Sequence, residues 1–349
     1  MITVCKFELP ARRHSSLAVL AAALTVVAFV TSACGSNGGA SSTTTAATAA
    51  AVPADTRAQA TVEAAVEASK EGTTEAAPAV ARIESEVIGD RRFEINVPAG
   101  YDGSKPVPLV VVLHGYTGSG AGAKPYFQLE AEATKRGFLT VYPDGTKDQE
   151  GNRFWNATDA CCQLTATKAD DSAYLMALID RVKQKFALDP KRVFFVGHSN
   201  GGFMSYRMAC EHADRIAAIV SVAGATFADV SACKPSQPVS VLQVHGTSDT
   251  VISFTGGSIL GHPYPGAQTS VTTWAAYNGC SAPAPDVGGE PLDFDELVAG
   301  KDARVTTFAG CALGGSAELW TIDGGSHEPK LTAEFASSIM DFLLTHPKP

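Results

Sequence analysis

Short, continuously apolar runs recur along the chain from about residue 83 onward. The runs PLVVVLHG (108–115), VFFV (193–196), IAAIVSVAG (216–224) and PVSVLQVHG (238–246) hold few polar residues and mostly end at or near glycine. Such runs are typical of strands that are buried on both faces of a sheet. RRFEINVP (91–98), FLTVYPDG (138–145) and AELWTID (317–323) predict three more strands.

Segments with helical periodicity separate these runs. Residues 170–186 place Leu175, Leu178, Ile179, Val182 and Phe186 on one helical face. Further helices are predicted over 128–136, 200–210, 270–277 and 332–344, the last two capped by Ser270 and Thr332. Alternating strands and helices predict a single α/β domain over residues 81–349, with a mostly parallel sheet covered by helices on both faces.

The first 80 residues differ from the rest. Three basic residues precede the apolar run LAVLAAALTVVAFV (17–30), which has the length of a signal-peptide core and is short for a membrane span. Small residues before Cys34 resemble the lipobox of bacterial lipoproteins, so we expect residues 1–33 to be removed and Cys34 to be lipidated. An ordinary signal-peptide cut nearby is the alternative. Residues 34–80 are rich in Ala, Thr, Ser and Gly, which indicates a flexible tether.

Cysteine usage agrees with export to the cell envelope or beyond. Six cysteines remain besides Cys5 and Cys34, and an even number in an exported chain indicates disulfides. A bond between neighbours is strained, so we expect Cys161 and Cys162 to pair with Cys210 and Cys233, and Cys280 with Cys311. The Cys and His spacings match no usual metal site, and we expect no metal.

Charge excludes one class of partner. The formal net charge is −9, and Lys and Arg form no cluster, which argues against nucleic-acid binding. We expect contact with a membrane only through the lipid anchor.

The strongest chemical signal is Gly197-His198-Ser199-Asn200-Gly201, the one G-x-S-x-G match in the chain. It follows a predicted strand and opens a predicted helix. A sharp turn there would expose the Ser199 hydroxyl above the sheet, and bulky residues two positions away would collide across it. The helix N-terminus also favours a developing negative charge. The pattern predicts a nucleophilic serine, whereas its alternative is a plain Gly-rich turn.

A nucleophilic serine needs a base and an acid, which follow it in the order Ser, acid, His in this arrangement. His327 in DGGSHEPK lies between a predicted strand and the last helix, whereas His262 and His346 lie in a Gly/Pro-rich loop and near the C-terminus. Asp249 follows the buried strand 238–246. The competing carboxylates are Asp293, Asp295 and Asp323. Ser199, His327 and Asp249 are therefore the predicted triad.

An oxyanion hole needs two backbone N–H donors. We expect one from Asn200, which follows the serine, and one from Tyr116, in the loop after the strand 108–113. His198 and Trp155 are candidates for the substrate cleft.

Several segments resemble one known group of proteins. NVPAGYDGSKPVPLVVVLHGYTGSG, FWNATDACC, ADDSAYLMALIDRV, LDPKRVFFVGHSNGGFMSYRMAC, HGTSDTVISFTGG and IDGGSHEP look like the polyhydroxybutyrate depolymerase and feruloyl esterase group of α/β-hydrolases. The match runs from about residue 92 to the C-terminus, with the motifs in the group's order. The resemblance implies an α/β-hydrolase fold, the same triad and oxyanion donors, and exported ester hydrolysis through an acyl-enzyme without a cofactor.

The chain departs from the group directly after His327. Members often carry Trp-Pro there, whereas this chain has Glu328-Pro329, so an aromatic residue of the cleft is missing. The expected substrate is an ester, and both polyesters and feruloyl or acetyl esters of polysaccharides remain open. A serine peptidase on the same fold and a catalytically silent surface-binding protein are the alternatives.

Overall fold

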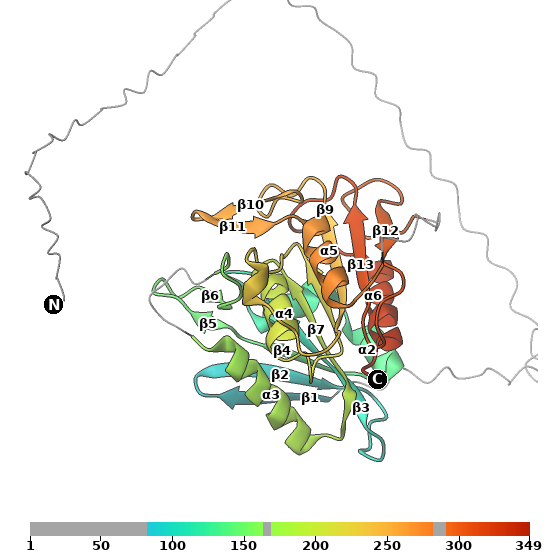
Figure 1. Ribbon diagram of the computed structural model, residues 1–349. Coiled ribbons are helices and arrows are strands. Elements are labelled where there is room, and N and C mark those ends of the chain that lie inside the picture. The colour runs from blue at the N-terminus through green and yellow to red at the C-terminus, as the bar shows by residue number, and fades with distance from the viewer. Residues whose placement is uncertain (1–81, 163–168, 282–290) are drawn as a thin grey trace, which may run out of the picture. The chain divides into compact units, whose positions relative to one another are not determined.

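The computed structural model describes residues 82–162, 169–281 and 291–349, which all belong to one compact unit (Figure 1). The expected signal peptide, the lipidation site Cys34 and the tether lie outside the described residues. No helix in the described ranges combines the length and the apolar character needed to cross a bilayer.

Nine strands form the central sheet (Figure 1). In spatial order they are β1 (Arg82–Ile88), β2 (Arg91–Val97), β4 (Leu139–Pro143), β3 (Val107–Leu113), β7 (Leu188–His198), β8 (Ala218–Val222), β9 (Ser240–Gly246), β13 (Ala317–Ile322) and β12 (Ala303–Thr307). The strands from β4 to β13 pair in parallel, and β1, β2 and β12 add antiparallel edges. Two short hairpins lie outside the sheet: β5 (Thr146–Lys147) with β6 (Arg153–Phe154), and β10 (Gly256–Ile259) with β11 (His262–Pro265).

Three helices cover each face of the sheet. Alternate residues of a strand point to opposite faces, so each central strand contributes side chains to both cores. Val110 and Val112 of β3 pack with α1 (Gly120–Phe127), α2 (Glu130–Arg136) and α6 (Ala333–Thr345). Leu109 and Val111 of the same strand belong to the core under α3 (Asp171–Lys185) and α4 (Asn200–Glu211), and Trp274 joins α5 (Ala267–Tyr277) to that core. A short 3₁₀ helix spans Val230–Ala232. The predicted fold class is confirmed.

The helix predictions differ from the structure in two places. Helix α1 was not expected, because Gly120, Gly122 and Pro125 conceal its periodicity. Helix α5 begins at Ala267 after an N-cap at Gly266, so Ser270 is an interior residue whose hydroxyl accepts from the N–H of Thr226. By contrast, the Thr332 hydroxyl caps α6 as predicted, accepting from the N–H of Phe335 at 3.1 Å.

Two of the three predicted disulfides, those joining Cys161 and Cys162 to Cys210 and Cys233, are wrong. Cys210, at the end of α4, pairs with Cys233, whose Cα lies 5.6 Å away, within the range that a disulfide spans. Neither of these two cysteines is then free to pair with Cys161 or Cys162. Cys161 forms a disulfide with its neighbour Cys162, and the peptide bond between them is cis. Cys280 pairs with Cys311, as expected.

Candidate active site

Three side chains meet above the carboxyl ends of three parallel strands. Ser199 follows β7, Asp249 follows β9 and His327 follows β13. His327 Nε2 lies 2.9 Å from Ser199 Oγ, and His327 Nδ1 lies 2.8 Å from Asp249 Oδ2. The three residues are separated by 50 or more positions in the sequence, and the parallel sheet brings them together because its strands all end at the same edge.

The turn at Ser199 requires glycine on both sides. Ser199 has φ 53° and ψ −120°, a region that L-residues rarely adopt, and its N–H donates to Val222 O at 2.7 Å. A Cβ on Gly197 would lie 2.1 Å from Gly201 O, and a Cβ on Gly201 would lie 2.4 Å from Leu113 O. The motif therefore reflects close backbone approach across the turn, which lifts the hydroxyl toward His327.

Asp249 is held by hydrogen bonds to both of its carboxylate oxygens. Oδ1 accepts from the N–H groups of Val251 and Ile252, each at 2.8 Å, and Oδ2 faces His327. Burial by itself would raise the pKa of this carboxyl, but bonds from His245 and His327 outweigh it and hold the pKa well below its usual range. Asp249 is therefore ionised and oriented toward His327 at neutral pH.

His198 supports His327 from its other side. The ring Nε2–H of His198 donates to the backbone oxygen of His327 at 2.8 Å, and the two rings lie 5.0 Å apart. Burial, with a smaller contribution from neighbouring His327, lowers the pKa of His198 to about 4. His198 is thus neutral at pH 7 and adds no positive charge where an imidazolium would form.

The segments that carry the expected oxyanion donors flank Ser199. A Cβ on Gly115 would lie 3.4 Å from Ser199 Cβ, so the loop after β3 passes directly beside the serine. Tyr116 follows in that loop, and its hydroxyl donates to Asp148 at 2.8 Å. The backbone N–H of Asn200 opens α4 on the other side of the serine.

A buried clamp fixes both segments to the connection after β6. The Asn200 side chain accepts from the N–H of Trp155 at 2.7 Å and donates to the oxygen of the same residue at 2.8 Å. The Trp155 indole N–H donates to His114 O at 3.0 Å. The His114 ring accepts from the N–H of Gly145 at 2.9 Å and donates to Gly115 O at 2.7 Å, and burial lowers its pKa to about 4.

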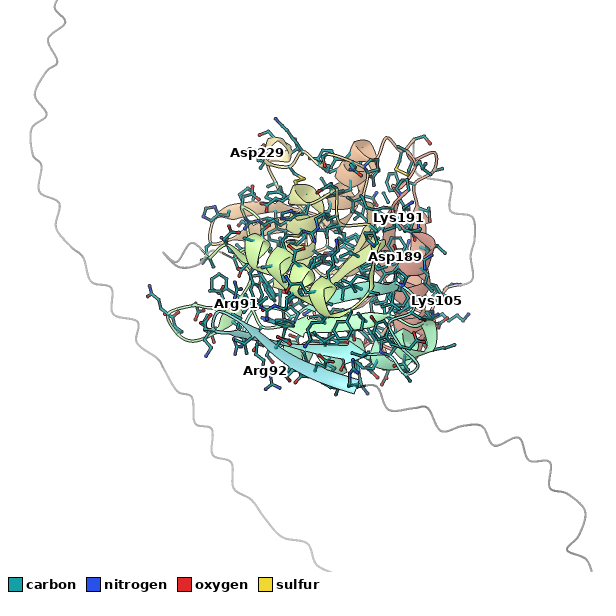
Figure 2. All side chains as sticks on the ribbon, turned by 90° about the horizontal axis from the view of Figure 1, so that it is seen from below. Arg91, Arg92, Lys105, Asp189, Lys191 and Asp229 are labelled. Carbon is teal, nitrogen blue, oxygen red and sulfur yellow. A yellow bond between two sulfur atoms is a disulfide. The ribbon has the colours of Figure 1, made fainter. Side chains whose placement is uncertain are left out.

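Asp171, at the start of α3, anchors this connection in turn. Its carboxylate accepts from the N–H of Asn156 at 2.6 Å and from the Thr146 hydroxyl at 2.8 Å, and it pairs with Arg91 of β2. Arg91 also lies over the ring of Tyr174, whereas its neighbour Arg92 bonds Ser85 and Glu94. Figure 2 labels the two arginines on the strand. Through Asp171, strand β2 thus holds the connection after β6, and that connection holds the segments that carry Tyr116 and Asn200.

The serine and histidine open into a cavity of about 470 Å³. Residues of the loop after β3 and of α1 form one wall, and residues in or next to Ser199, Asp249 and His327 form the others. The lining side chains include Tyr116, Tyr126, Phe127, His198, Val251 and Glu328. Such a volume suits one small-molecule-sized group.

Of the two residues predicted to line the substrate cleft, one does and one does not. His198 lines the cavity. Trp155 does not, and this prediction is wrong: the indole is fully buried, because its N–H bonds His114 O and its ring packs beside His114 and Tyr174. Among Tyr116, Phe154 and Trp155, only Tyr116 lines the cavity and could replace the missing tryptophan.

The competing candidates have other partners. Asp323 pairs with Arg304, and Asp295 accepts from the N–H groups of Leu297 and Lys330. His346 bonds Phe342 O at the end of α6, and His262 is exposed on β11. Within the described ranges, no three His, Cys, Asp or Glu side chains are grouped as metal ligands would be. The sequence did not identify His245 and Gln243 as site residues, although they lie behind Asp249 in the fold.

Comparison with known proteins gives a family and several relatives. The family described as "Esterase PHB depolymerase" matches residues 92–285. Feruloyl esterase B of Piromyces equi is 31% identical over 245 residues, which cover 68% of this chain and 42% of that protein. Feruloyl esterase C of Emericella nidulans is 28% identical over 233 residues, covering 64% of this chain and 73% of that protein. This chain therefore spans less than half of the first relative and most of the second.

Solved structures agree in fold. An acetyl xylan esterase from Aspergillus awamori superposes with a TM-score of 0.54 at 17% identity, covering 75% of this chain and 98% of that one. A thermostable esterase superposes with a TM-score of 0.50 at 13% identity, covering 76% of this chain and 63% of that one. Both share the α/β-hydrolase fold with this chain. The family match covers more than half of the sequence and includes Ser199 and Asp249, and the chain belongs to the Esterase PHB depolymerase family.

Proposed function

We propose that the protein is a serine carboxylic ester hydrolase with Ser199 as nucleophile, His327 as general base and Asp249 as the acid that orients His327. The observation that carries this proposal is the hydrogen-bonded series from Ser199 Oγ through His327 to Asp249, with Ser199 and His327 facing a cavity of about 470 Å³. Membership in an esterase family supports the same chemistry.

The first half of the reaction would form an acyl-enzyme. Because His327 Nδ1–H donates to Asp249, Nε2 is free to accept a proton from Ser199 Oγ. Ser199 Oγ then bonds to the ester carbonyl carbon, and the carbonyl electrons move to oxygen. The N–H groups of Tyr116 and Asn200 would stabilise that oxyanion. When the C–O bond to the alcohol breaks, the proton on Nε2 moves to the leaving oxygen.

The second half would release the acid. A water molecule gives a proton to His327 Nε2 and attacks the acyl carbon, and a second tetrahedral intermediate forms at the same donors. Its collapse breaks the bond to Ser199 Oγ, which takes the proton back. Asp249 stays ionised throughout, since its hydrogen bonds and the nearby imidazole hold its pKa low.

The cavity supports a compact acyl or alcohol group as substrate. Its size fits one aromatic or short-chain unit, and Tyr116 and Tyr126 give it an aromatic wall. Relatives named feruloyl esterases and a neighbour named acetyl xylan esterase point to esters of plant polysaccharides, and the family description points to a polyester. We propose an ester of this kind, single or part of a polymer, as substrate.

A matched ester panel tests the proposal. The full chain and Ser199→Ala are compared on p-nitrophenyl acetate and butyrate, methyl ferulate and a polyhydroxybutyrate suspension. We expect turnover that falls at least a thousandfold in the variant, and the preferred ester then defines the subclass. If both proteins are equally inert and the wild type also resists a fluorophosphonate probe, the proposal fails.

We further propose that the enzyme works outside the cytoplasm as a lipid-anchored protein. Residues 1–33 would be the signal peptide, Cys34 the lipidated residue, 34–80 the tether and 81–349 the catalytic domain. Three disulfides support an oxidising compartment. Cys34→Ala should move the protein from the membrane fraction to the soluble fraction of an expressing bacterium. Retention of that variant in the membrane fraction would contradict a lipid anchor at this residue.

A further inference from the structure

A second histidine lies directly behind the carboxylate of Asp249. His245, near the end of β9, places Nε2 at 3.2 Å from Asp249 Oδ2, the same oxygen that faces His327. The His245 side chain is 1% exposed, and its ring packs edge-on against Phe254. The chemistry proposed above does not use this buried titratable group.

Two backbone carbonyls fix where its proton lies. Gly224 O lies 3.0 Å from one end of the Gln243 side-chain amide, which must therefore be the NH₂ group, because an oxygen there would face another acceptor. The same NH₂ group lies 3.0 Å from His245 Nδ1, so Nδ1 is the acceptor and the proton is on Nε2. His245 Nε2 is also 2.7 Å from Ile252 O, which requires a donor and gives the same assignment.

The network continues into the helix that follows the nucleophile. The Tyr206 hydroxyl of α4 donates to the Gln243 side-chain oxygen at 2.9 Å, and both residues are fully buried. Each group from Tyr206 to Asp249 thus has a donor or acceptor role set by its neighbour. Because water is excluded, the His245 N–H has no alternative partner besides Ile252 O and Asp249.

We propose that His245, held by Gln243, is a positioning residue that fixes the Asp249 carboxylate against rotation and limits how strongly it attracts a proton on His327. The proposal rests on the triad proposed above. His245 would act in two ways: its N–H competes with His327 for Oδ2, which tempers the basicity of the carboxylate, and its contact with Ile252 O holds the turn whose N–H groups bind Oδ1.

The charged and titratable groups around His245 come from four elements. Asp249 lies on the turn after β9, His327 on the loop after β13, His198 at the end of β7, and Tyr206 on α4 at the far end of the network. Asp249, whose pKa is held well below its usual range, is the carboxylate among them and lies between the His245 and His327 rings. A change at His245 therefore acts on His327 mainly through Asp249.

Two substitutions separate positioning from packing. In His245→Gln, the longer amide can still place an N–H near Asp249 Oδ2 and Ile252 O. In His245→Asn, the shorter amide can meet Gln243 but cannot reach Asp249. Both variants keep a polar partner for Gln243. Full-length variants are measured for kcat and KM on p-nitrophenyl butyrate from pH 5 to 9, together with thermal unfolding and the low-field proton resonance of His327 Nδ1–H.

We expect His245→Asn to lower kcat by about 10- to 100-fold, with KM within about twofold of wild type, since a misplaced catalytic group affects the transition state more than binding. The acid limb of its kcat/KM profile should move to higher pH, because Asp249 with one donor fewer holds a protonated imidazole more strongly. Its low-field resonance should move further downfield. His245→Gln should stay within about threefold of wild type in kcat.

Asn278→Ala provides the control for a lost buried amide. Asn278 bonds both backbone groups of Val239 and the oxygen of Ser316 and touches none of the triad, so this variant should lose stability and keep the wild-type pH profile. A His245→Asn variant that behaves like Asn278→Ala, less stable but with unchanged kcat, pH profile and resonance, overturns the proposal. An inert wild type would instead contradict the ester hydrolysis, and the resonance would still decide the positioning role.

Discussion

The glycine at position 201 gives the sharpest test of how the site is built. Its Cα faces the end of β3, where an added Cβ would lie 2.4 Å from Leu113 O and 2.7 Å from His114 O. Both are backbone atoms that no rotamer change can move. In Gly201→Ala, helix α4 and the end of β3 must therefore separate by about 0.6 Å to reach even 3.0 Å, the shortest distance that Cβ atoms normally tolerate.

That separation acts on the two proposed oxyanion donors, because Asn200 opens α4 and Tyr116 follows β3. One misplaced donor costs about 10²- to 10³-fold when it is lost entirely, and a 1 Å displacement can cost about 10²-fold. We therefore expect kcat to fall by about 10- to 100-fold. Overpacking should also cost about 1–3 kcal/mol of folding free energy, or a decrease in Tm of roughly 2–10 °C.

Gly122→Ala is the matched control. Gly122 also lies in the first turn of a helix that lines the cavity, but the nearest atom to its added Cβ is the Ser119 hydroxyl at 3.5 Å, an ordinary contact. Alanine there should be neutral or stabilise the helix by up to about 1 kcal/mol. The assay is p-nitrophenyl butyrate hydrolysis with thermal unfolding. If Gly201→Ala matches Gly122→Ala in both, close approach of α4 and β3 does not position the oxyanion donors.

Three further predictions concern charge. Burial lowers the pKa of His114 and His198 to about 4, below the value of about 6.5 in the unfolded chain, so the unfolded state binds more protons between these pH values. The free energy of unfolding should therefore be highest above pH 6.5 and fall toward pH 4, by up to about 3 kcal/mol for each histidine. If urea titrations give the same free energy of unfolding at every pH in this range, the two histidines do not have lowered pKa values in the folded protein. Asp249→Asn should lower kcat by about 10⁴-fold by disfavouring the required His327 tautomer, whereas Asp323→Asn should leave kcat unchanged. Glu328→Gln should raise kcat/KM for an anionic ester, p-nitrophenyl succinate, by about 2- to 10-fold relative to the neutral butyrate, and an unchanged ratio would exclude Glu328 as a selector of charge.

The sequence predicted the parts of the fold that a local pattern specifies. The buried strands β3, β8 and β9 and the second half of β7 coincide with apolar runs, and α3 and α6 have clear caps and apolar faces. The edge strands β1 and β12 are half exposed and carry no such signal. Helix α1 contains glycines and a proline, and it is stabilised by its packing against β3 and β4 and by the Ser119 cap at its start.

The same distinction holds for the site. Ser199, Asp249 and His327 were expected because each follows a strand at a recognisable turn. The structural role of Trp155 could not be predicted in this way. The indole is buried because Trp155 bonds Asn200 and His114, which are 45 and 41 residues away in the sequence. His245 and Gln243 likewise look like ordinary residues of a strand. Their function emerges only when the sheet places them behind Asp249, so residues that support a site are harder to predict than those that perform its chemistry.

The way the cavity is lined has an evolutionary consequence. Its reacting groups rest on closely packed glycines and buried hydrogen-bond networks, whereas Val251 and Glu328 lie exposed at its rim and take part in no core packing. Mutations at these two positions can therefore alter which ester enters without a cost in folding. Related enzymes can diverge in substrate while they retain one catalytic framework, and directed evolution of this protein should begin at the same two positions.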